Sequence, residues 1–458
     1  MKIIQSRQDY NNSMNRQQID MTHGPLTSKI LFYAIPLAIT AILQQLFNAA
    51  DVAIVGQFAG TDAMAAVGAN SSLISFFVNL FVGISLGTNV VIAHAIGREE
   101  KEDIHKAVHT SIYIALFGGL FMLILGEIIA PKILSMMSVP DSIFSLALRY
   151  LRIYLAGMPV IFLYNFESAI YRGQGNTRTP LIALTIGGLL NVLLNLFCVL
   201  ILKMSVEGVA LATVVSNLIS SSILFMTLVH STEEIRIRFD ELKVDKDILV
   251  RILKIGLPSG IQSSVFSVAN IIVQSAINSL GAIVIAASSA AFNLEIFAYY
   301  VMNSFGQACT TFVGQNFGAG KMDRCRKTLY SSFLLAVLFT FLSIVFILFF
   351  GKNLLAFFNS DKEVIEYGYQ RLMIIFFAYI FSVWQEIGSG YLRGFGLSLW
   401  PALLSLVGIC GIRIFWIFFV FPKYPTFITI LLVFPISLCA VAVAIVLAIL
   451  ILKPSKRA

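Results

Sequence analysis

The sequence predicts an all-α polytopic membrane protein with twelve transmembrane helices in two six-helix bundles, related by a pseudo-two-fold axis along the membrane normal. Composition is the first observation behind this prediction: 58% of the 458 residues are hydrophobic and 12% are charged, whereas about 25% of residues are charged in soluble proteins. The second observation is a series of apolar runs long enough to cross a bilayer. The third is a set of matching residues in the two halves of the chain.

The apolar runs define the twelve predicted crossings. They lie at residues 30–58, 64–96, 108–130, 147–171, 181–202, 206–229, 251–279, 282–317, 328–350, 367–391, 399–421 and 427–452. The second and eighth runs are longer than a straight crossing requires, so these helices must tilt, bend or continue beyond the membrane. An even number of crossings places both termini on the same side of the membrane.

Two loops with the pattern ArgGlyXGly, each followed by Pro, show most clearly that the halves of the chain repeat. Residues 171–180 and 392–401 share Arg, both Gly and Pro at a spacing of 221. Further pairs at a spacing of 221 or 222 are Gly97 with Gly318, Lys106 with Lys327, Pro36 with Pro258, and Asn48 with Asn270. This constant spacing predicts a duplication. Units of six crossings share one orientation, as in carriers whose two bundles enclose a central cleft.

The distribution of Lys and Arg predicts the orientation. With the N-terminus inside, 23 of these residues lie on the cytoplasmic side and 8 on the other, and positive residues favour the cytoplasm. We expect a multi-pass protein of the plasma (inner) membrane with both termini cytoplasmic. The expected parts are an N-terminal tail (1–29), an N-terminal bundle (30–229), a cytoplasmic linker (230–250), a C-terminal bundle (251–452) and a C-terminal tail (453–458).

Composition and motifs also argue against several classes of function. The net charge of +8 comes from basic residues in short loops, so we expect no nucleic-acid partner. The sequence has no HisGluXXHis motif and no cluster of Cys and His at the membrane face, which argues against metal chemistry. We expect a monomer in contact with membrane lipid that is not an enzyme and has no cofactor.

Asp51 is the first candidate site residue, because it lies near the end of the first apolar run. Gln44, Asn48 and Asp51 are spaced i, i+4 and i+7 and therefore share one helical face. A carboxylate inside a membrane is costly unless it faces protein or a water-filled cavity, so Asp51 is a candidate functional residue. The alternative is that Asp51 lies near a membrane interface and is merely solvated.

The second half carries other charges. Val273 stands where the repeat would place a second Asp51, whereas Glu295, Glu386 and Arg413 lie within later apolar runs. A carboxylate and Arg413 could neutralise each other inside the bundle. Alternatively, Glu295 or Glu386 attracts a cationic substrate or takes part in coupling. The seventh run has a polar stripe, made of Ser267, Asn270, Gln274 and Asn278, that would line a cleft.

Residues 20–455 resemble the multidrug and toxic compound extrusion (MATE) transporters of the MOP flippase superfamily. The resemblance is carried by MetThrHisGlyPro (21–25), Pro36 and Asp51 in the first helix, the paired ArgGlyXGly loops, and ThrPheValGlyGlnAsnPheGlyAlaGly (311–320). It implies twelve helices in two bundles and export of amphiphilic, often cationic, compounds driven by inward H⁺ or Na⁺.

The resemblance also implies a cation site in the N-terminal bundle. Its residues fall on Asp51, Gln44, Asn191 and Thr213, while Asn195 stands where many family members have an acid. Asn191 and Asn195 are spaced i, i+4, so one helix can turn both toward Asp51. Carboxylate, amide and hydroxyl oxygens suit a hard cation. The alternative is a hydrogen-bonded packing cluster.

The function expected from these features is a cation-coupled antiporter for small amphiphilic organic substrates, with H⁺ or Na⁺ as the coupling ion. A lipid or polysaccharide flippase of the same superfamily is the main alternative, but it would need a basic cleft, and only Arg413 lies deep in an apolar run. The sequence contains none of the motifs expected of a polytopic membrane enzyme. A channel is disfavoured because the duplicated units contain no repeated filter-like loop.

Overall fold

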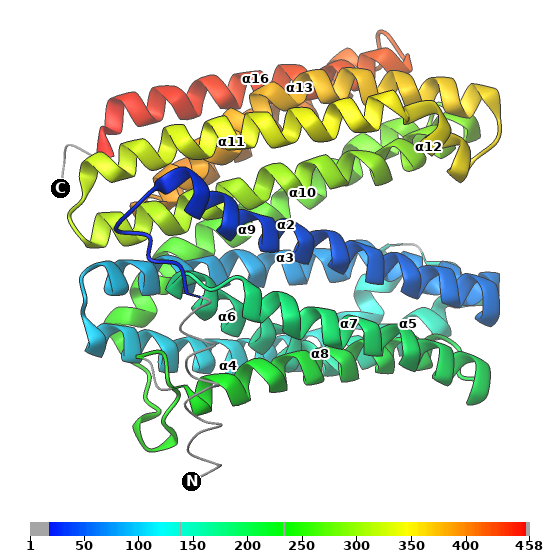
Figure 1. Cartoon of the computed structure of the whole chain (residues 1–458). Helices are drawn as coiled ribbons and strands as arrows, with labels where there is room; N and C mark the ends of the chain where they lie inside the picture. The colour runs from blue at the N-terminus through cyan, green and yellow to red at the C-terminus, as the bar shows by residue number, and fades with distance from the viewer. Residues whose placement is uncertain (1–17, 138, 232–233, 455–458) are drawn as a thin grey trace. The chain divides into compact units, whose positions relative to one another are not determined.

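The computed structural model describes residues 18–454, except residues 138 and 232–233. Residues 1–17 of the predicted N-terminal tail and 455–458 of the predicted C-terminal tail lie outside this described part. Within it the chain forms helices joined by short loops and contains no β-strand (Figure 1). The predicted all-α class is therefore confirmed.

The helices follow one another along the chain with few intervening residues. The α-helices are α2 (Leu26–Ile54), α3 (Thr61–Gly97), α4 (Lys101–Met136), α5 (Asp141–Ala156), α6 (Met158–Gln174), α7 (Arg178–Leu196), α8 (Val206–His230), α9 (Lys246–Asn278), α10 (Ala282–Gly318), α11 (Met322–Phe349), α12 (Gly351–Phe358), α13 (Lys362–Gly394), α14 (Leu399–Ser405), α15 (Ile412–Phe415) and α16 (Phe427–Leu452). Short π-helical segments extend some of them: η1 (Val55–Ala59), η2 (Phe197–Ile201), η4 (Leu406–Gly411) and η5 (Trp416–Val420).

Eleven helical segments of the described chain are long and apolar enough to cross a membrane, and the bent pair of α5 and α6 makes up to twelve. This agrees with a polytopic protein of twelve crossings. At the fourth crossing the sequence predicts one helix, but the structure has two that meet at 47°. Pro159 lies in the first turn of α6, where its missing N–H is not needed, so a new helix begins there.

The chain divides into two compact units. The first unit contains Ile39–Gly256, and the second contains Met21–Ala38 with the chain from Leu257 onward. Helix α2 is therefore shared between the units, with its division between residues 38 and 39. Helix α9 is shared in the same way, with its division between residues 256 and 257.

In the first unit, α6 is the central helix and packs against α3, α4 and α8. Figure 1 shows α4, α6 and α8 running side by side. Phe81 of α3 stacks on Phe162 of α6 with their ring centroids 3.6 Å apart. These stacked rings belong to a core of closely packed apolar side chains between the helices of this unit.

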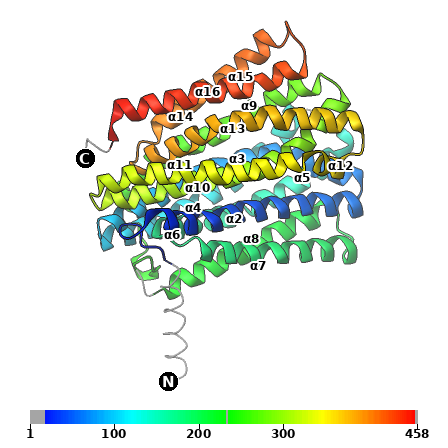
Figure 2. The ribbon, with the colours of Figure 1, turned by 45° about the horizontal axis from the view of Figure 1, so that its top comes forward.

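In the second unit, α13 is the central helix and packs against α10, α11 and α16. Figure 2 shows α10, α11 and α13 side by side. The first part of α2 is attached to α10 through Tyr33. Its hydroxyl donates a hydrogen bond to Thr311 Oγ1 at 3.0 Å, and its ring meets that of Phe312 edge to face at 5.7 Å.

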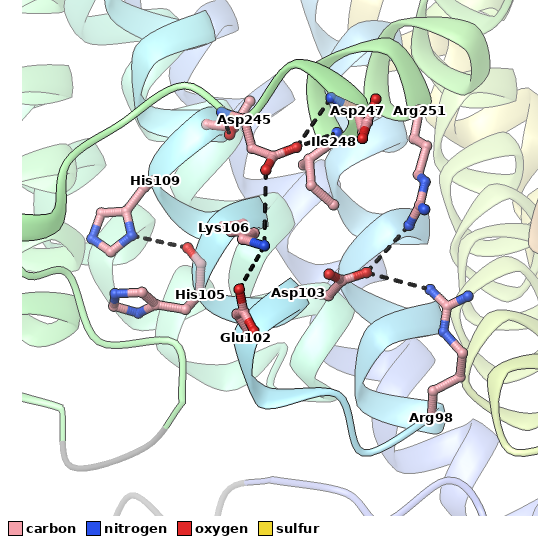
Figure 3. Close-up of polar contacts among 11 residues, drawn as sticks. Arg98, Glu102, Asp103, His105, Lys106, His109, Asp245, Asp247, Ile248 and Arg251 are labelled. Carbon is pink, nitrogen blue, oxygen red and sulfur yellow. Dashed lines mark hydrogen bonds and ion pairs between the residues drawn. The ribbon is translucent and has the colours of Figure 1, made fainter.

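The connection between α8 and α9 lies against the first turns of α4 (Figure 3). The backbone N–H of Asp245 donates to Thr110 Oγ1 at 3.1 Å, and its carboxylate lies 4.0 Å from Lys106 Nζ. Asp245 Oδ1 also accepts hydrogen bonds from the N–H groups of Asp247 and Ile248, both at 3.0 Å. Asp245 therefore satisfies free donors at the start of α9 in the manner of an N-cap.

Ion pairs reinforce this connection. Asp103 of α4 lies 3.2 Å from Arg251 of α9 and 3.9 Å from Arg98, which follows α3 (Figure 3). Glu241 in the loop accepts hydrogen bonds from Arg238 at 2.9 Å and from His105 at 2.5 Å. These bonds lower the pKa of Glu241 below its usual value, chiefly through Arg238. The loop is therefore held to the first unit by charged groups.

Candidate functional site

Asp51 lies in the last turn of α2 and is 9% exposed. The helix continues as the π-helical segment η1 and ends at Gly60, whose φ of 94° is in the left-handed region. Such π-helical turns are common at functional sites. Asp51 itself faces α7 and α8 of the first unit, where its hydrogen-bond partners lie.

The carboxylate of Asp51 accepts hydrogen bonds from two other helices. Asn195 of α7 donates through Nδ2 to Oδ1 at 2.5 Å, and Thr213 of α8 donates through Oγ1 to Oδ2 at 3.3 Å. The Thr213 hydroxyl has one hydrogen and also lies 3.0 Å from the carbonyl oxygen of Val209. It can therefore turn away from the carboxylate without losing a hydrogen bond.

Asn191 completes the cluster one turn before Asn195. Its Oδ1 accepts from Asn195 Nδ2 at 3.3 Å, and its Nδ2 donates to Thr213 Oγ1 at 3.5 Å. Because both contacts of Asn195 Nδ2 are with acceptors, the orientation of the Asn195 amide follows from the network. The structure thus brings Asp51, Asn191, Asn195 and Thr213 together in one place.

Two observations indicate that this cluster suits a cation. Asp51 forms no ion pair with any described side chain, so its charge is balanced only by neutral hydrogen-bond donors. Asn195 Oδ1 is buried and has no hydrogen-bond partner in the described part of the chain. An unsatisfied buried acceptor is costly. A cation next to the carboxylate would use both groups, since amide and carboxylate oxygens are typical ligands of hard cations.

Close packing of α2 on α7 positions the carboxylate. A Cβ at Gly188 would overlap the ring of Phe47. Phe47 lies one turn before Asp51, and Gly188 lies one turn before Asn191. The glycine therefore lets the aromatic ring lie directly against α7, which allows the short Asp51 side chain to reach Asn195.

Gln44 does not join this network. Its side chain is exposed and forms no hydrogen bond with the other predicted site residues. Gln44 precedes Asp51 by seven residues, about 10 Å along the helix axis. The structure therefore groups four of the five predicted residues and leaves Gln44 apart.

Glu295 in the second unit is paired with Arg371, not with Arg413. The guanidinium of Arg371 makes two hydrogen bonds to the Glu295 carboxylate, at 2.7 and 3.0 Å, and a third to Ser288 Oγ at 3.1 Å. Both charged residues are 5% exposed. The suggestion that a carboxylate and Arg413 neutralise each other is therefore wrong for Glu295, whose partner is the neighbouring Arg371.

The other predicted residues of the second unit lie apart from this pair. Glu386 accepts hydrogen bonds from Asn303 at 3.2 Å and Gln385 at 3.5 Å, and forms no ion pair with the described residues. Arg413 donates to neutral groups only, and Gln274 donates to Asn278 at 2.8 Å. Neither carboxylate therefore neutralises Arg413.

Sequence reasoning missed two buried residues. Arg371 lies within the predicted run 367–391 but was not among the candidate residues. Its place inside an apolar run was the signal that it needs a partner. Glu167 lies within the predicted run 147–171, and it is fully buried and accepts a hydrogen bond from Ser221 at 2.8 Å.

Comparison of the sequence with models of protein families identifies the family that the chain matches. The model of the MatE family matches the chain twice, over residues 36–197 and 258–419. The two matches have equal length and begin 222 residues apart. This is the spacing at which Pro36 and Pro258 repeat, so the match and the internal repeat agree.

Relatives and solved structures agree with this family. The chain is 28% identical to the probable multidrug resistance protein YoeA of Bacillus subtilis over 393 residues, which covers 83% of this chain and 84% of YoeA. It is 27% identical to the probable multidrug resistance protein NorM of Thermotoga maritima, with coverage of 85% and 84%. A solved outward-facing multidrug resistance MATE family transporter of the MOP superfamily superimposes with a TM-score of 0.88 at 22% identity, with coverage of 96% and 98%. The chain therefore belongs to the MatE family, and it is a multi-pass membrane transporter rather than an enzyme.

Proposed function

We propose that this transporter is a cation-coupled antiporter that exports amphiphilic, cationic organic compounds in exchange for H⁺ or Na⁺ by alternating access. The observation that carries the proposal is the buried Asp51, which has hydrogen bonds from Asn195 and Thr213 but no ion pair within the described residues. The names of YoeA and NorM as multidrug resistance proteins support the substrate class.

Asp51 would act as the coupling group because its charge changes when a cation binds. A bound H⁺ or Na⁺ removes the uncompensated negative charge and changes which packing of α2, α7 and α8 is favoured. The unpartnered Asn195 Oδ1 would contribute to the same site. Asn195 carries no charge, so the cluster has one carboxylate, and this favours H⁺ over Na⁺ as the coupling ion.

The test is transport by the purified protein in vesicles. An imposed H⁺ or Na⁺ gradient should drive movement of a fluorescent cationic dye against the direction of the ion. Replacing Asp51 by Asn keeps the size and the hydrogen-bonding ability of the side chain but removes its charge. We expect gradient-driven transport by Asp51→Asn to fall to the level of protein-free vesicles.

Asp62→Asn is the matched control, because Asp62 is an exposed acid in the first turn of α3. This variant should transport like the unaltered protein. Full gradient-driven transport by Asp51→Asn would disprove the coupling role. The ion gradient that drives transport in the unaltered protein identifies the coupling ion.

A further inference from the structure

The guanidinium of Arg413 is a buried charge that the proposed coupling step does not use. Arg413 is 5% exposed and lies in α15, between the π-helical segments η4 and η5. Its Nη1 donates to Asn270 Oδ1 at 2.9 Å, and its Nε donates to Ser437 Oγ at 3.4 Å. A guanidinium has five N–H donors, and Nη2 makes no hydrogen bond within the described chain.

Two guanidinium groups lie near one aromatic ring in this region. The Cζ of Arg413 is 4.5 Å from the ring centroid of Phe434 on α16, and the Cζ of Arg371 is 5.7 Å from it. Arg371 is paired with Glu295, but Arg413 forms no ion pair with a described carboxylate. The region around Phe434 therefore carries one positive charge that no described acidic group balances.

Glu386 is too distant to balance the charge of Arg413. Arg371 lies near the same Phe434 ring as Arg413. Glu386 follows Arg371 by 15 residues in the same helix, α13, which corresponds to about 22 Å along the axis. A buried charge without a counter-charge is costly. An anionic group from outside the chain would remove that cost, so this position suits an anionic ligand.

A polar stripe on α9 gives access to the guanidinium. Asn270, Gln274 and Asn278 are spaced i, i+4 and i+8 and are all exposed in the structure. Amide side chains on one face of a membrane-crossing helix face water or a ligand, because hydrocarbon offers them no hydrogen bonds. Asn270 belongs to this stripe and also accepts a hydrogen bond from Arg413. The exposed amides of the stripe therefore reach the guanidinium.

We propose that Arg413, with Asn270 and Ser437, binds the carboxylate group of an amphiphilic substrate. A planar guanidinium can make two parallel hydrogen bonds to a carboxylate, and the Nη1 and Nη2 edge of Arg413 would provide them. The ring of Phe434 lies beside this edge and offers an apolar surface to the rest of the molecule. The site would extend the substrates to amphiphiles that carry an acidic group, including zwitterions.

This inference rests on the proposed function only in taking the bound compound as cargo. Binding itself can be measured in detergent without any ion gradient. Rhodamine 19 and its ethyl ester, rhodamine 6G, share one cationic chromophore, and only rhodamine 19 carries a free carboxylate. Fluorescence polarisation of each dye with the full-length protein therefore isolates the contribution of the carboxylate.

The most informative variant is Asn270→Asp. It places a carboxylate at the atom that now lies 2.9 Å from Arg413 Nη1, so the guanidinium gains an internal partner. Because Asn270 is exposed, the substitution should not prevent folding. Affinity for rhodamine 19 should fall on the order of tenfold, the loss expected for one hydrogen bond to a charged group. Affinity for the ester should stay constant or increase.

Asn278→Asp adds the same charge two turns along the same face and should reduce rhodamine 19 binding less than Asn270→Asp does. Arg413→Gln should lower the affinity for rhodamine 19 as Asn270→Asp does. An equal affinity of Asn270→Asp and the unaltered protein for rhodamine 19 would overturn the proposal, as would an equal loss for both dyes. Asp62→Asn should bind both dyes normally. Because binding is measured without an ion gradient, a failure of ion coupling is distinguished from a failure of this site.

Discussion

Buried ionisable side chains in this transporter are balanced in different ways. Asp51 accepts hydrogen bonds from neutral groups, whereas Glu295 forms a bidentate ion pair with Arg371. A fully paired charge is suited to holding helices in position, because neither partner can leave without exposing the other. A carboxylate with only neutral donors can exchange a cation at less cost. The first unit therefore holds a buried acid without a charged partner, and the second holds a buried ion pair.

The ion pair of Glu295 and Arg371 leads to a stability prediction. Arg371→Met should lower the free energy of unfolding by about 3–5 kcal/mol, because it leaves Glu295 buried and unpaired. The double variant Glu295→Met with Arg371→Met removes both charges and should recover most of this loss. Thermal unfolding in detergent measures the difference. A double variant as unstable as Arg371→Met would show that the unpaired carboxylate is not the cause.

At the scale of elements, α2 and α9 are the helices that the two units share. Each contains an internal proline close to its division, Pro36 in α2 and Pro258 in α9. Proline removes a backbone hydrogen bond within a helix and allows a bend. The repeat therefore places a proline, at which a helix can bend, close to the division of each of these helices.

The contact of α9 with α3 in the first unit depends on glycine. A Cβ at Gly87 would overlap the carbonyl oxygen of Ile252, and a backbone atom cannot move aside as a side chain can. We expect Gly87→Ala to lower the free energy of unfolding by about 1–3 kcal/mol, the usual cost of overpacking. Thermal unfolding in detergent would measure this change.

Gly68→Ala is the control for this prediction, because Gly68 lies in the same helix with open space around it. Alanine there should stabilise α3 by about 0.5–1 kcal/mol, since glycine is unfavourable within a helix. Equal stability of Gly87→Ala and Gly68→Ala would contradict the importance of the close contact between α3 and α9.

At the scale of the whole molecule, a duplicated sequence has acquired two different chemistries. Val273 of the second unit is buried and apolar where the repeat would place an acid equivalent to Asp51. The second unit instead has the buried residues Arg371 and Arg413. Under the proposals made above, this divergence would let the first unit respond to a cation while the second contacts a substrate of a different charge.

The orientation of the chain is a further prediction at this scale. The excess of Lys and Arg in alternate loops favours a cytoplasmic location for both termini. Green fluorescent protein fused after Ala458 should therefore fluoresce, and alkaline phosphatase fused after Lys423 should be active, because this loop would face outward. An active phosphatase fused after Ala458 would reverse the predicted orientation.

The sequence by itself determined the class of the protein, the crossings, the repeat and most of the candidate cation site. Class and crossings depend on the length and apolarity of each run, which are local properties. The i, i+4 spacing of Asn191 and Asn195 placed both on one face of α7, and the family resemblance directed them toward Asp51. The structure then brought these residues within hydrogen-bonding distance.

Only the tertiary structure decided which distant side chains are partners. Glu295 and Arg371 are separated by 76 residues, and their contact depends on how α10 and α13 are rotated about their own axes. Helical spacing shows which residues share a face but not which helix that face meets. For the same reason the prediction included Gln44 in the cation site, whereas the structure leaves it outside the Asp51 cluster. The sequence also left open that Arg413 has only neutral partners within the described chain.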